Sequence, residues 1–530
     1  MAQIRQRILI PFLLAAASLP AARKFYPDDP LSAMPPPLNV ASARARDIND
    51  YYDFFFNSFA EPGKQEIKHH NPSPSRAVNT LGEVPDNSWF TNRIGSRPMS
   101  LEELVRGPGA DHSPDQTKPW TVLSGKNQGI SPGLVMRDAA GRKYFLKFDP
   151  KSNPEMASAA DVIGTRFFYD LGYFTPENYI VNFPREQLAL NAKSTIKDAE
   201  GHSRTMLRRD LDNLLAKVPR DSRGRYRGMA SLTIPGQIIG PHRYSGTRSD
   251  DPNDIVPHEE RRDQRGLSIF CAWLNHTDAK SINSLDSLVE IDGVRSVRHY
   301  LIDFGDIMGS DSDEPKEVWR GHMFVWDPRP AAWQALSLGF YSPAWQRAHF
   351  PDIPAIGNFD YRTFDPLRWH SNYQNPAFDL RTPGDIYWAA KKVMAFDDAA
   401  IRAIVQTGQY SDPRAVEWAA RCLIERRNRI GRAAFDLVLP LDNFRVESGR
   451  LAFDDLAVKY RFHAPRPYSI AWFTFDNETG ARTAIAGAAS MEVPRSEAPY
   501  LSAEIRSPGD PKTVTIYLRG AAVVGIERGQ

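Results

Sequence analysis

Hydrophobic positions along the chain change their period several times, and these changes divide it into segments. Residues 44–60 place aromatic side chains at helical spacing, which predicts a helix with one packing face. Short alternating runs at 121–124, 134–137 and 143–148 predict three strands. The interval 153–171 then has the 3.6-residue period of a helix with one buried face.

The second half of the chain contains one more strand pair and a series of helices. Strand-like residues 287–291 and 297–302 flank an Asp292-Gly293 turn, which predicts a hairpin. Helical periodicity predicts further helices at 257–275, 383–395, 397–406 and 412–432. Beyond residue 435 the runs 456–462, 470–475 and 513–518 alternate between turn residues, which predicts a small, sandwich-like all-β region. The order of elements therefore predicts an α+β fold.

Composition is that of an ordinary globular protein of 530 residues, with 42% hydrophobic and 25% charged positions. A net charge of +2 argues against a dedicated nucleic-acid binder, which usually carries a strong basic excess. The two cysteines, Cys271 and Cys422, are too few for a disulfide framework. Both lie in apolar helical patterns, so we expect them to be small buried core residues.

The first 22 residues have the layout of a secretory signal peptide. Arg5 and Arg7 precede the apolar run 8–19, and small residues follow it. The run is shorter than the about 20 apolar residues that a membrane span needs, and we expect no stable membrane span elsewhere. The mature protein is therefore expected to be secreted or periplasmic.

Two short motifs carry the candidate chemistry. Residues 276–283 read H-T-D-A-K-S-I-N, with the spacing H-x-D-x-K-x-x-N, and residues 303–305 read D-F-G. This pair resembles the catalytic loop and the metal-binding motif of the protein-kinase-like superfamily. Phosphoryl transfer needs a carboxylate for the attacking hydroxyl, a cation near the moving phosphate, and oxygen ligands for magnesium.

The resemblance implies a role for each motif residue. Asp278 would orient and deprotonate the acceptor hydroxyl, and Lys280 would steady the γ-phosphate of ATP. Asn283 and Asp303 would hold Mg²⁺, which prefers hard oxygen ligands. His276 is expected to be structural.

Lys147 lies within an apolar strand, where its charge is costly unless it is paired or reaches solvent. In the kinase resemblance it is the lysine that contacts the nucleotide phosphates and pairs with a helix carboxylate. Glu155, in the first turn of the following helix, is the expected partner, with Asp161 in reserve. Gly125 and Gly129 are expected to let backbone amides approach the phosphates.

The resemblance covers about residues 120–435 and implies a two-lobed kinase-like fold. The lobes would span about 119–240 and 241–435, after an N-terminal extension at 23–118 and before a β-rich accessory domain at 436–530. The D-F-G region looks as much like that of lipid-kinase and HipA-like enzymes as like that of ordinary protein kinases. Thr277 replaces the arginine that usually precedes the catalytic aspartate. Secreted families such as CotH place this chemistry outside the cytoplasm.

Together these features predict an extracytoplasmic, ATP- and Mg²⁺-dependent phosphotransferase. Its acceptor would be a hydroxyl of a protein, a glycan or a small molecule. One alternative is a pseudokinase that serves as a binding or scaffold protein of the cell envelope. Another is a kinase-like enzyme that transfers a different part of the nucleotide, such as AMP.

Overall fold

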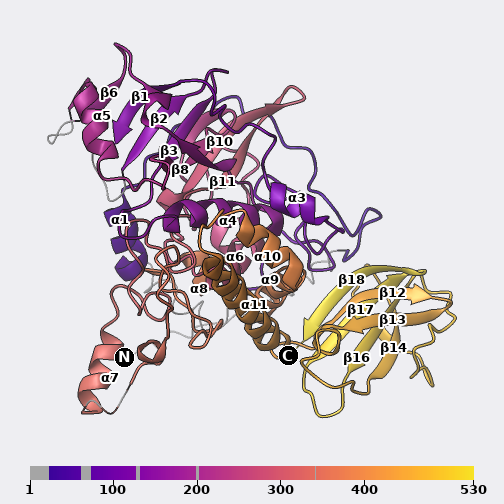
Figure 1. Ribbon diagram of the computed structural model, residues 1–530. Helices are drawn as coiled ribbons and strands as arrows, with labels where there is room; N and C mark the ends of the chain where they lie inside the picture. Colours follow the sequence, from indigo (N-terminus) through magenta and orange to yellow (C-terminus); the bar gives the residue numbers. More distant parts are fainter. Residues whose placement is uncertain are drawn as a thin grey trace, which may run out of the picture. The chain divides into compact units, whose positions relative to one another are not determined.

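The computed structural model describes residues 23–60, 73–126, 132–197, 202–338, 340 and 342–529. The expected signal peptide and Gly129 lie outside these ranges. Contacts divide the chain into two units, and Figure 1 shows their elements. The larger unit comprises Leu31–Pro440 with Asp455–Pro465, and the smaller one is built mainly from Leu441–Asp454 and Arg466–Gln530.

A sheet of eight strands forms the first part of the larger unit, with the order β4-β8-β3-β2-β1-β6-β7 and with β5 beside β1. Its strands are β1 (Trp120–Lys126), β2 (Gly133–Arg137), β3 (Lys143–Lys147), β4 (Asn178–Phe183), β5 (Leu188–Ala189), β6 (Thr195–Lys197), β7 (Ser203–Thr205) and β8 (Tyr226–Leu232). In β3, Tyr144 and Leu146 point into a hydrophobic core that also contains Trp120. Strand alternation turns Lys147 to the other face. The predicted strands at 121–124, 134–137 and 143–148 are confirmed.

Two helices accompany this sheet, α4 (Met156–Leu171) and α5 (Arg208–Leu215). Helix α4 contacts β4 and β8 and is buried along almost its whole length. Gly172 ends it, with a φ of +130° that only glycine adopts readily. The segment between β4 and β8 also holds the 3₁₀ turn η2 (Arg185–Gln187).

A second, antiparallel sheet has the order β11-β10-β9. Its strands are β9 (Gln237–Gly240), β10 (Ser284–Ile291) and β11 (Val294–Leu301). The predicted hairpin is confirmed, and Asp292 and Gly293 form its turn with φ values of +51° and +77°. Two positive φ values are what the tight turn of a two-residue hairpin requires.

The largest hydrophobic core is built mainly from helix side chains, among them Ile163 and Phe167 of α4. The other helices that contribute, drawn in Figure 1, include α6 (Arg262–Leu274), α8 (Pro376–Asp379), α9 (Pro383–Met394), α10 (Asp398–Gln406) and α11 (Pro413–Phe435). All residues of α6 from Asp263 to Leu274 are buried, so this helix delivers the chain to His276 from inside the core. Cys271 and Cys422 are free and buried, as predicted.

The remaining described elements of the larger unit are short. They are α1 (Asp50–Phe55), the π-helical turn η1 (Phe56–Ala60), α3 (Leu101–Arg106), η3 (His258–Glu260), η4 (Ser281–Asn283), α7 (Pro328–Leu336), η5 (Ala344–Arg347) and α12 (Leu456–Lys459). The predicted strand at 456–462 is wrong, because the carboxylate of Asp455 caps the helical turn α12. Leu456 and Ala457 then pack into the helical core.

The expected packing face of residues 44–60 is also wrong. Tyr51, Phe55 and Phe59 are exposed, whereas Asp53 and Asn57 are buried. The helical segment covers only residues 50–60 of the expected 44–60, and it turns Asp53 and Asn57 toward the protein.

The smaller unit is all-β. Its five-stranded antiparallel sheet has the order β15-β14-β16-β17-β18, beside the strand pair β12-β13. The strands are β12 (Leu441–Glu447), β13 (Arg450–Asp455), β14 (Ser469–Phe475), β15 (Arg482–Ala484), β16 (Tyr500–Arg506), β17 (Thr513–Arg519) and β18 (Ala522–Gly529). The α+β class and the C-terminal all-β region are confirmed.

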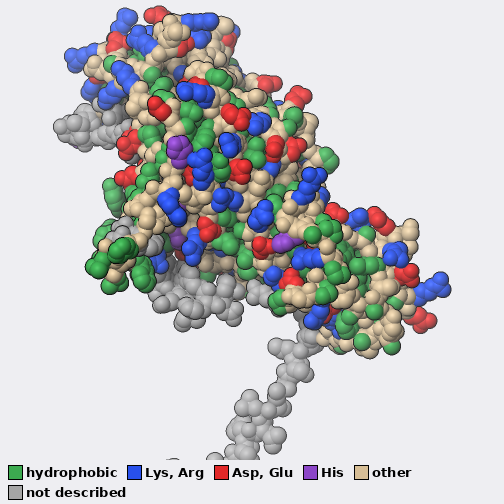
Figure 2. Space-filling view, turned by 60° about the horizontal axis from the view of Figure 1, so that its bottom comes forward, with side chains coloured by type: hydrophobic (Ala, Val, Ile, Leu, Met, Phe, Trp, Pro, Cys, Tyr) green, Lys and Arg blue, Asp and Glu red, His purple; other side chains and the backbone are tan. Residues whose placement is uncertain are grey.

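Acidic and basic side chains are interspersed over the face shown in Figure 2, in keeping with the small net charge. Among the described residues, none of the helices combines the length and the apolar character needed to cross a membrane.

Candidate active site

The β10–β11 hairpin brings the two predicted magnesium ligands together. Asn283 immediately precedes β10, and Asp303 follows β11 by two residues. The first rung of the hairpin pairs Ser284 with Leu301, and the amide of Ile302 donates to the carbonyl of Asn283 at 3.1 Å. The two side chains therefore extend from the same end of a rigid hairpin.

Asp278 lies at the centre of a second group of polar contacts. Asn283 Nδ2 donates to Asp278 Oδ2 at 2.8 Å, and Asn372 Nδ2 donates to Oδ1 at 3.1 Å. Lys280 Nζ lies 3.1 Å from the same Oδ1. Burial, reinforced by the nearby charge of Asp306, raises the pKa of Asp278 despite the opposing effect of Lys280. A raised pKa makes this carboxylate a stronger base than an exposed aspartate.

Lys147 reaches Asp303 from the large sheet. Its Nζ lies 2.6 Å from Asp303 Oδ1 and 3.2 Å from Asp161 Oδ2. Burial disfavours the ammonium, but the two carboxylates outweigh that effect and raise the pKa of Lys147. Burial likewise opposes the charged form of Asp303, yet Lys147 holds the pKa of this carboxyl below its ordinary value. The predicted lysine and the D-F-G aspartate thus form an ion pair.

The prediction that Glu155 is the partner of Lys147 is wrong. Glu155 Oε2 accepts from the backbone amide and the hydroxyl of Ser411, at 2.8 and 3.1 Å. Its φ of +70° is not helical, so α4 begins at Met156, after the Asn153-Pro154 start that the sequence predicts. The reserve choice, Asp161, lies further along α4 and takes the lysine.

Asp161 also ties α4 to the D-F-G segment. Its Oδ1 accepts from the amide of Phe304 at 2.8 Å. The ring of Phe304 is fully buried and stacks on Phe168, with ring centroids 4.8 Å apart. A side chain at Gly164 would begin 2.6 Å from Phe304 Cβ, so glycine is what allows this close approach. Helix α4 therefore fixes both the lysine and the segment that carries Asp303.

A buried ion pair lies beneath the catalytic-loop residues. Asp306 Oδ1 contacts Lys316 Nζ and accepts from the amide of Thr277 at 3.2 Å. Burial opposes the charge on Asp306, but Lys316 lowers its pKa to about 2. His276 Nδ1 lies 3.1 Å from the Asp306 carbonyl, which agrees with a structural role. The sequence pattern gives no sign of Lys316.

Helix α1 contributes carboxylates that the sequence analysis missed. Asp50 Oδ2 lies 2.9 Å from Lys280 Nζ, so the ammonium is shared between Asp50 and Asp278. Asp53 is buried and accepts from Tyr373 at 3.4 Å, and burial raises its pKa. These contacts explain why α1 turns its polar side inward.

The predicted phosphate contacts of Gly125 and Gly129 remain without support from the structure. Gly125 lies in β1, where a Cβ would meet Met206 Cε at 3.0 Å. Close packing of Met206 is therefore sufficient reason for glycine at this position. A phosphate contact of Gly125 stays a prediction, as does that of Gly129, which lies outside the described ranges.

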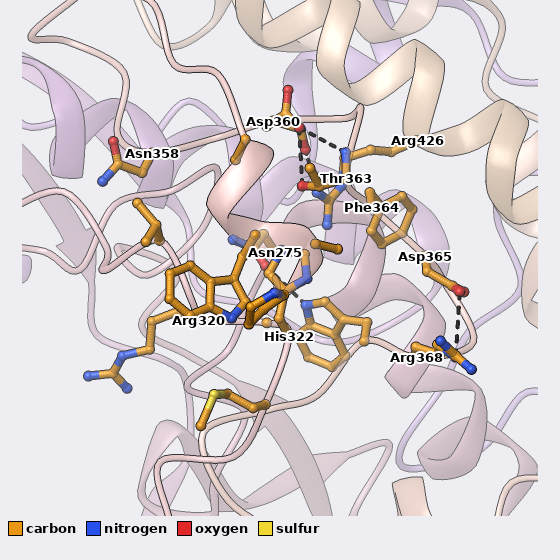
Figure 3. Close-up of a pocket in the computed structure, with 18 of the residues that line it drawn as sticks. Asn275, Arg320, His322, Asn358, Asp360, Thr363, Phe364, Asp365, Arg368 and Arg426 are labelled. Atoms are coloured by element: carbon orange, nitrogen blue, oxygen red, sulfur yellow. Dashed lines mark hydrogen bonds and ion pairs between the residues drawn. The ribbon is translucent and has the colours of Figure 1, made fainter. Parts of the chain in front are cut away.

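A cavity of about 220 Å³ opens beside the residue that precedes the catalytic loop, Asn275 (Figure 3). Trp369 Nε1 donates to Asn275 Oδ1 at 3.0 Å within it. Arg426, on another wall, donates to the carbonyls of Ala272 and Trp273 at the end of α6. The guanidinium therefore satisfies helix-terminal carbonyls. None of the site residues predicted from the sequence lines this cavity.

Several solved kinase structures are similar to this chain. A Helicobacter pylori proinflammatory kinase, CtkA, matches at 11% identity with a TM-score of 0.30, over 57% of this chain and 94% of that chain. A Golgi casein kinase matches at 10% identity with a TM-score of 0.28, over 76% of this chain and 96% of that one. The Golgi casein kinase with Mn and ADP bound matches at 11% with a TM-score of 0.28, over 78% and 95%. No protein-family model and no curated protein sequence matches the chain. The chain is thus similar to solved kinases at low sequence identity.

Proposed function

We propose that the protein is a phosphotransferase that uses ATP and Mg²⁺ to phosphorylate a hydroxyl group. The observation that most directly supports this is the 2.6 Å contact between Lys147 and Asp303, residues 156 positions apart. Phosphoryl transfer of this kind uses a strand lysine held by a helix carboxylate and a D-F-G aspartate that holds the metal, and this contact places Lys147 and Asp303 side by side. Asp278 and Asn283 lie at the same hairpin end as Asp303, so all the required groups converge.

The residues present fit Mg²⁺. Asp303 offers a carboxylate, and Asn283 uses its amide nitrogen toward Asp278, which leaves the amide oxygen to bind a cation. Magnesium is usually bound by one or two such oxygens together with phosphate and water. Bound ATP would supply the phosphoryl group, and Mg²⁺ would offset its charge.

Each chain residue then has a defined task. Asp278, with its raised pKa, accepts the proton of the acceptor hydroxyl and orients its oxygen. Lys280 places a positive charge beside Asp278, 3.1 Å away, where charge accumulates as the phosphoryl group moves. Lys147, held by Asp161, is placed to contact the nucleotide phosphates. The acceptor itself is a hydroxyl of a protein, a glycan or a small molecule.

The test is magnesium-dependent ATP turnover by the purified protein beside Asp278→Asn and Asp303→Asn. Loss of a general base typically costs about 100-fold or more in rate, and Asp303→Asn removes the carboxylate that would hold Mg²⁺, so both variants should lose turnover. Asp292→Asn removes one negative charge at the exposed hairpin turn and should keep full activity. A folded protein that binds no nucleotide would overturn the proposal.

A pseudokinase is the second candidate, and one contact favours it. Lys280 is already bound by Asp50, a carboxylate from outside the two motifs. If this pair persists when nucleotide binds, the chain would bind ATP without transferring its phosphate. Nucleotide binding without turnover, in the wild type as in Asp278→Asn, would support this alternative. Transfer of AMP to an acceptor would instead identify the chain as a kinase-like enzyme that transfers AMP.

We also propose that the protein acts outside the cytoplasm. This rests on the charged, apolar and small-residue order of residues 1–22. Expression of the full chain, followed by N-terminal sequencing of the exported product, should show cleavage near Arg23. Full-length protein retained inside the cell would contradict it.

A further inference from the structure

Three side chains with metal-binding chemistry converge within the β9–β10–β11 sheet, apart from the Lys147 site. His242 Nδ1 lies 3.0 Å from Asp286 Oδ1, and His299 Nδ1 lies 2.7 Å from the same oxygen. The three ligand atoms all lie within 4.8 Å of one another. At most 3% of any of the three residues is exposed.

The strand register holds these side chains in place. Asp286 in β10 stands directly opposite His299 in β11, and it also pairs with Gly240 of β9. Residues directly opposite each other in an antiparallel pair point to the same face. His242 follows β9 by two residues, and its backbone amide donates to Ser284 Oγ at 3.0 Å. The cluster is therefore built on strands and not on a loop tip.

Both imidazoles turn Nδ1 toward Asp286, so Nδ1 is the atom that each would offer to a metal ion. If both contacts to Asp286 are hydrogen bonds, each Nδ1 carries its proton and each Nε2 is a bare lone pair. Both Nε2 atoms are buried and have no hydrogen-bond partner among the described residues. The three side chains therefore do not satisfy one another completely as a hydrogen-bond network.

A metal ion between the two Nδ1 atoms would leave the proton of each ring on Nε2. The rings lie against Trp89, which stacks on His299 at 3.6 Å and meets His242 edge-on at 4.7 Å between centroids. This packing fixes the orientation of both imidazoles, so that their Nδ1 atoms stay directed at Asp286.

The second oxygen of Asp286 has its own partner. Arg248 Nη1 lies 3.4 Å from Oδ2, and Arg248 Nε lies 2.9 Å from Asp250 Oδ1. A ligating carboxylate is commonly oriented by such an outer contact. Because Arg248 is shared with Asp250, Asp286 keeps negative charge for a cation at Oδ1.

We propose that His242, Asp286 and His299 form a structural binding site for a divalent transition metal, Zn²⁺ above all. Two imidazoles and one carboxylate suit zinc and are unsuited to Mg²⁺, which takes oxygen ligands. Three protein ligands leave one position of a tetrahedral site for water. The site is distinct from the magnesium ligands proposed at Asn283 and Asp303.

The proposed metal site lies close to the hairpin end that carries Asn283 and Asp303. Asp286 lies three residues after Asn283, and His299 lies four residues before Asp303. An ion held between them joins the two strands close to the hairpin end that carries both candidate magnesium ligands. It would stabilise the geometry of the phosphotransfer site without touching the nucleotide.

The direct test is the metal content of the full chain purified after expression with added Zn²⁺. Elemental analysis should find one zinc ion per chain, and Co²⁺ in its place should give the visible absorption of a low-symmetry site. Removal of zinc by a strong chelator should lower the melting temperature. The proposal would be overturned by a folded wild-type protein that contains no zinc and whose melting temperature does not change when Zn²⁺ is added.

Two variants locate the site. Asp286→Asn keeps the size of the side chain and its hydrogen-bond acceptor but loses the charge, and it should lose the metal. His258→Gln is the matched control, because His258 is an equally buried histidine that also contacts Trp89 but pairs with Asp254 at 2.8 Å. It should keep the zinc. Zinc retained in a folded Asp286→Asn, His299→Gln double variant would contradict the assignment, whether or not the protein turns over ATP.

Discussion

Lys147 Nζ and Asp303 Oδ1 lie 2.6 Å apart, which joins the large sheet to the D-F-G segment. Asp161 lies on the same ammonium at 3.2 Å, so one lysine neutralises two carboxylates. In the proposed phosphotransferase, a nucleotide would compete with Asp303 for this lysine, whereas Asp161 could stay bound to it. The pair therefore marks where the phosphates of a nucleotide would enter.

Asp161→Asn should weaken nucleotide binding. Without Asp161 the Lys147 side chain must be ordered when the nucleotide binds, which costs about 0.5–1.5 kcal/mol and corresponds to an affinity lower by a few-fold to about tenfold. Glu155→Gln should leave the affinity unchanged, because Glu155 binds Ser411 and not Lys147. Titration calorimetry with ATP and Mg²⁺ measures both. The opposite ranking would restore Glu155 as the partner of the lysine.

Gly164→Ala should destabilise the protein and disturb the D-F-G segment. The new methyl group would begin 2.6 Å from Phe304 Cβ, and overpacking of this kind costs about 1–3 kcal/mol. Gly384→Ala is the control, since the nearest atom there is Arg262 Nη2, at 3.3 Å instead of 2.6 Å. Urea unfolding should show a lower free energy of unfolding for Gly164→Ala alone. Equal values for the two variants would mean that α4 can shift away from Phe304.

Asp50→Asn should strengthen binding of ATP with Mg²⁺. The change frees Lys280 and removes a negative charge from the place where phosphate arrives. Partly exposed ion pairs are worth up to about 1 kcal/mol, so the expected gain is a few-fold. Asp47→Asn, an exposed aspartate three residues earlier, controls for net charge. Weaker binding in Asp50→Asn would instead identify Asp50 as a residue that positions Lys280.

Asp170 should make stability depend on pH. Its carboxylate is buried, and neither oxygen has a hydrogen-bond partner among the residues that the structure describes. Burial raises its pKa to about 8, although Arg93 and Arg166 oppose the shift. The folded state therefore binds a proton that the unfolded state releases near pH 4. It follows that stability falls as pH rises from about 4 to about 8.

Asp170→Asn should remove the contribution of Asp170 to the pH dependence of stability. The free energy of unfolding of the variant should therefore rise relative to that of the wild type between pH 5 and pH 9. Urea unfolding at several pH values measures the difference between the two proteins. Asp111→Asn, at an exposed position, should follow the wild type. Parallel curves for Asp170→Asn and the wild type would show that Asp170 is already ionised in the folded protein.

Much of the candidate site is predictable because it is local. The spacing of Asp278, Lys280 and Asn283 places them on one short loop, and the Asp292-Gly293 turn predicts the hairpin that returns to Asp303. The partner of Lys147 is not local. It depends on where α4 begins and how it packs, and Asp161 is only one of three charged residues in a largely apolar helix.

The orientation of α1 could not be predicted from the sequence either. Aromatic residues at helical spacing normally mark the buried face, yet here Asp53 and Asn57 are buried and the aromatic side is exposed. The deciding contacts come from Lys280 and Tyr373, more than 200 positions away. Hydrophobic periodicity predicts that a helix forms here, but contacts with residues distant in sequence determine which face of the helix is buried.

The β10–β11 hairpin has one further consequence. Eight paired rungs run from Ser284 and Leu301, at the candidate site, to Ile291 and Val294, beside the exposed turn at Asp292 and Gly293. At about 3.4 Å per residue, the seven steps from the first rung to the last span roughly 24 Å. Homologous chains can therefore vary in loop length there at little cost, and a reporter peptide or a surface tether inserted at this turn would leave the reacting groups undisturbed.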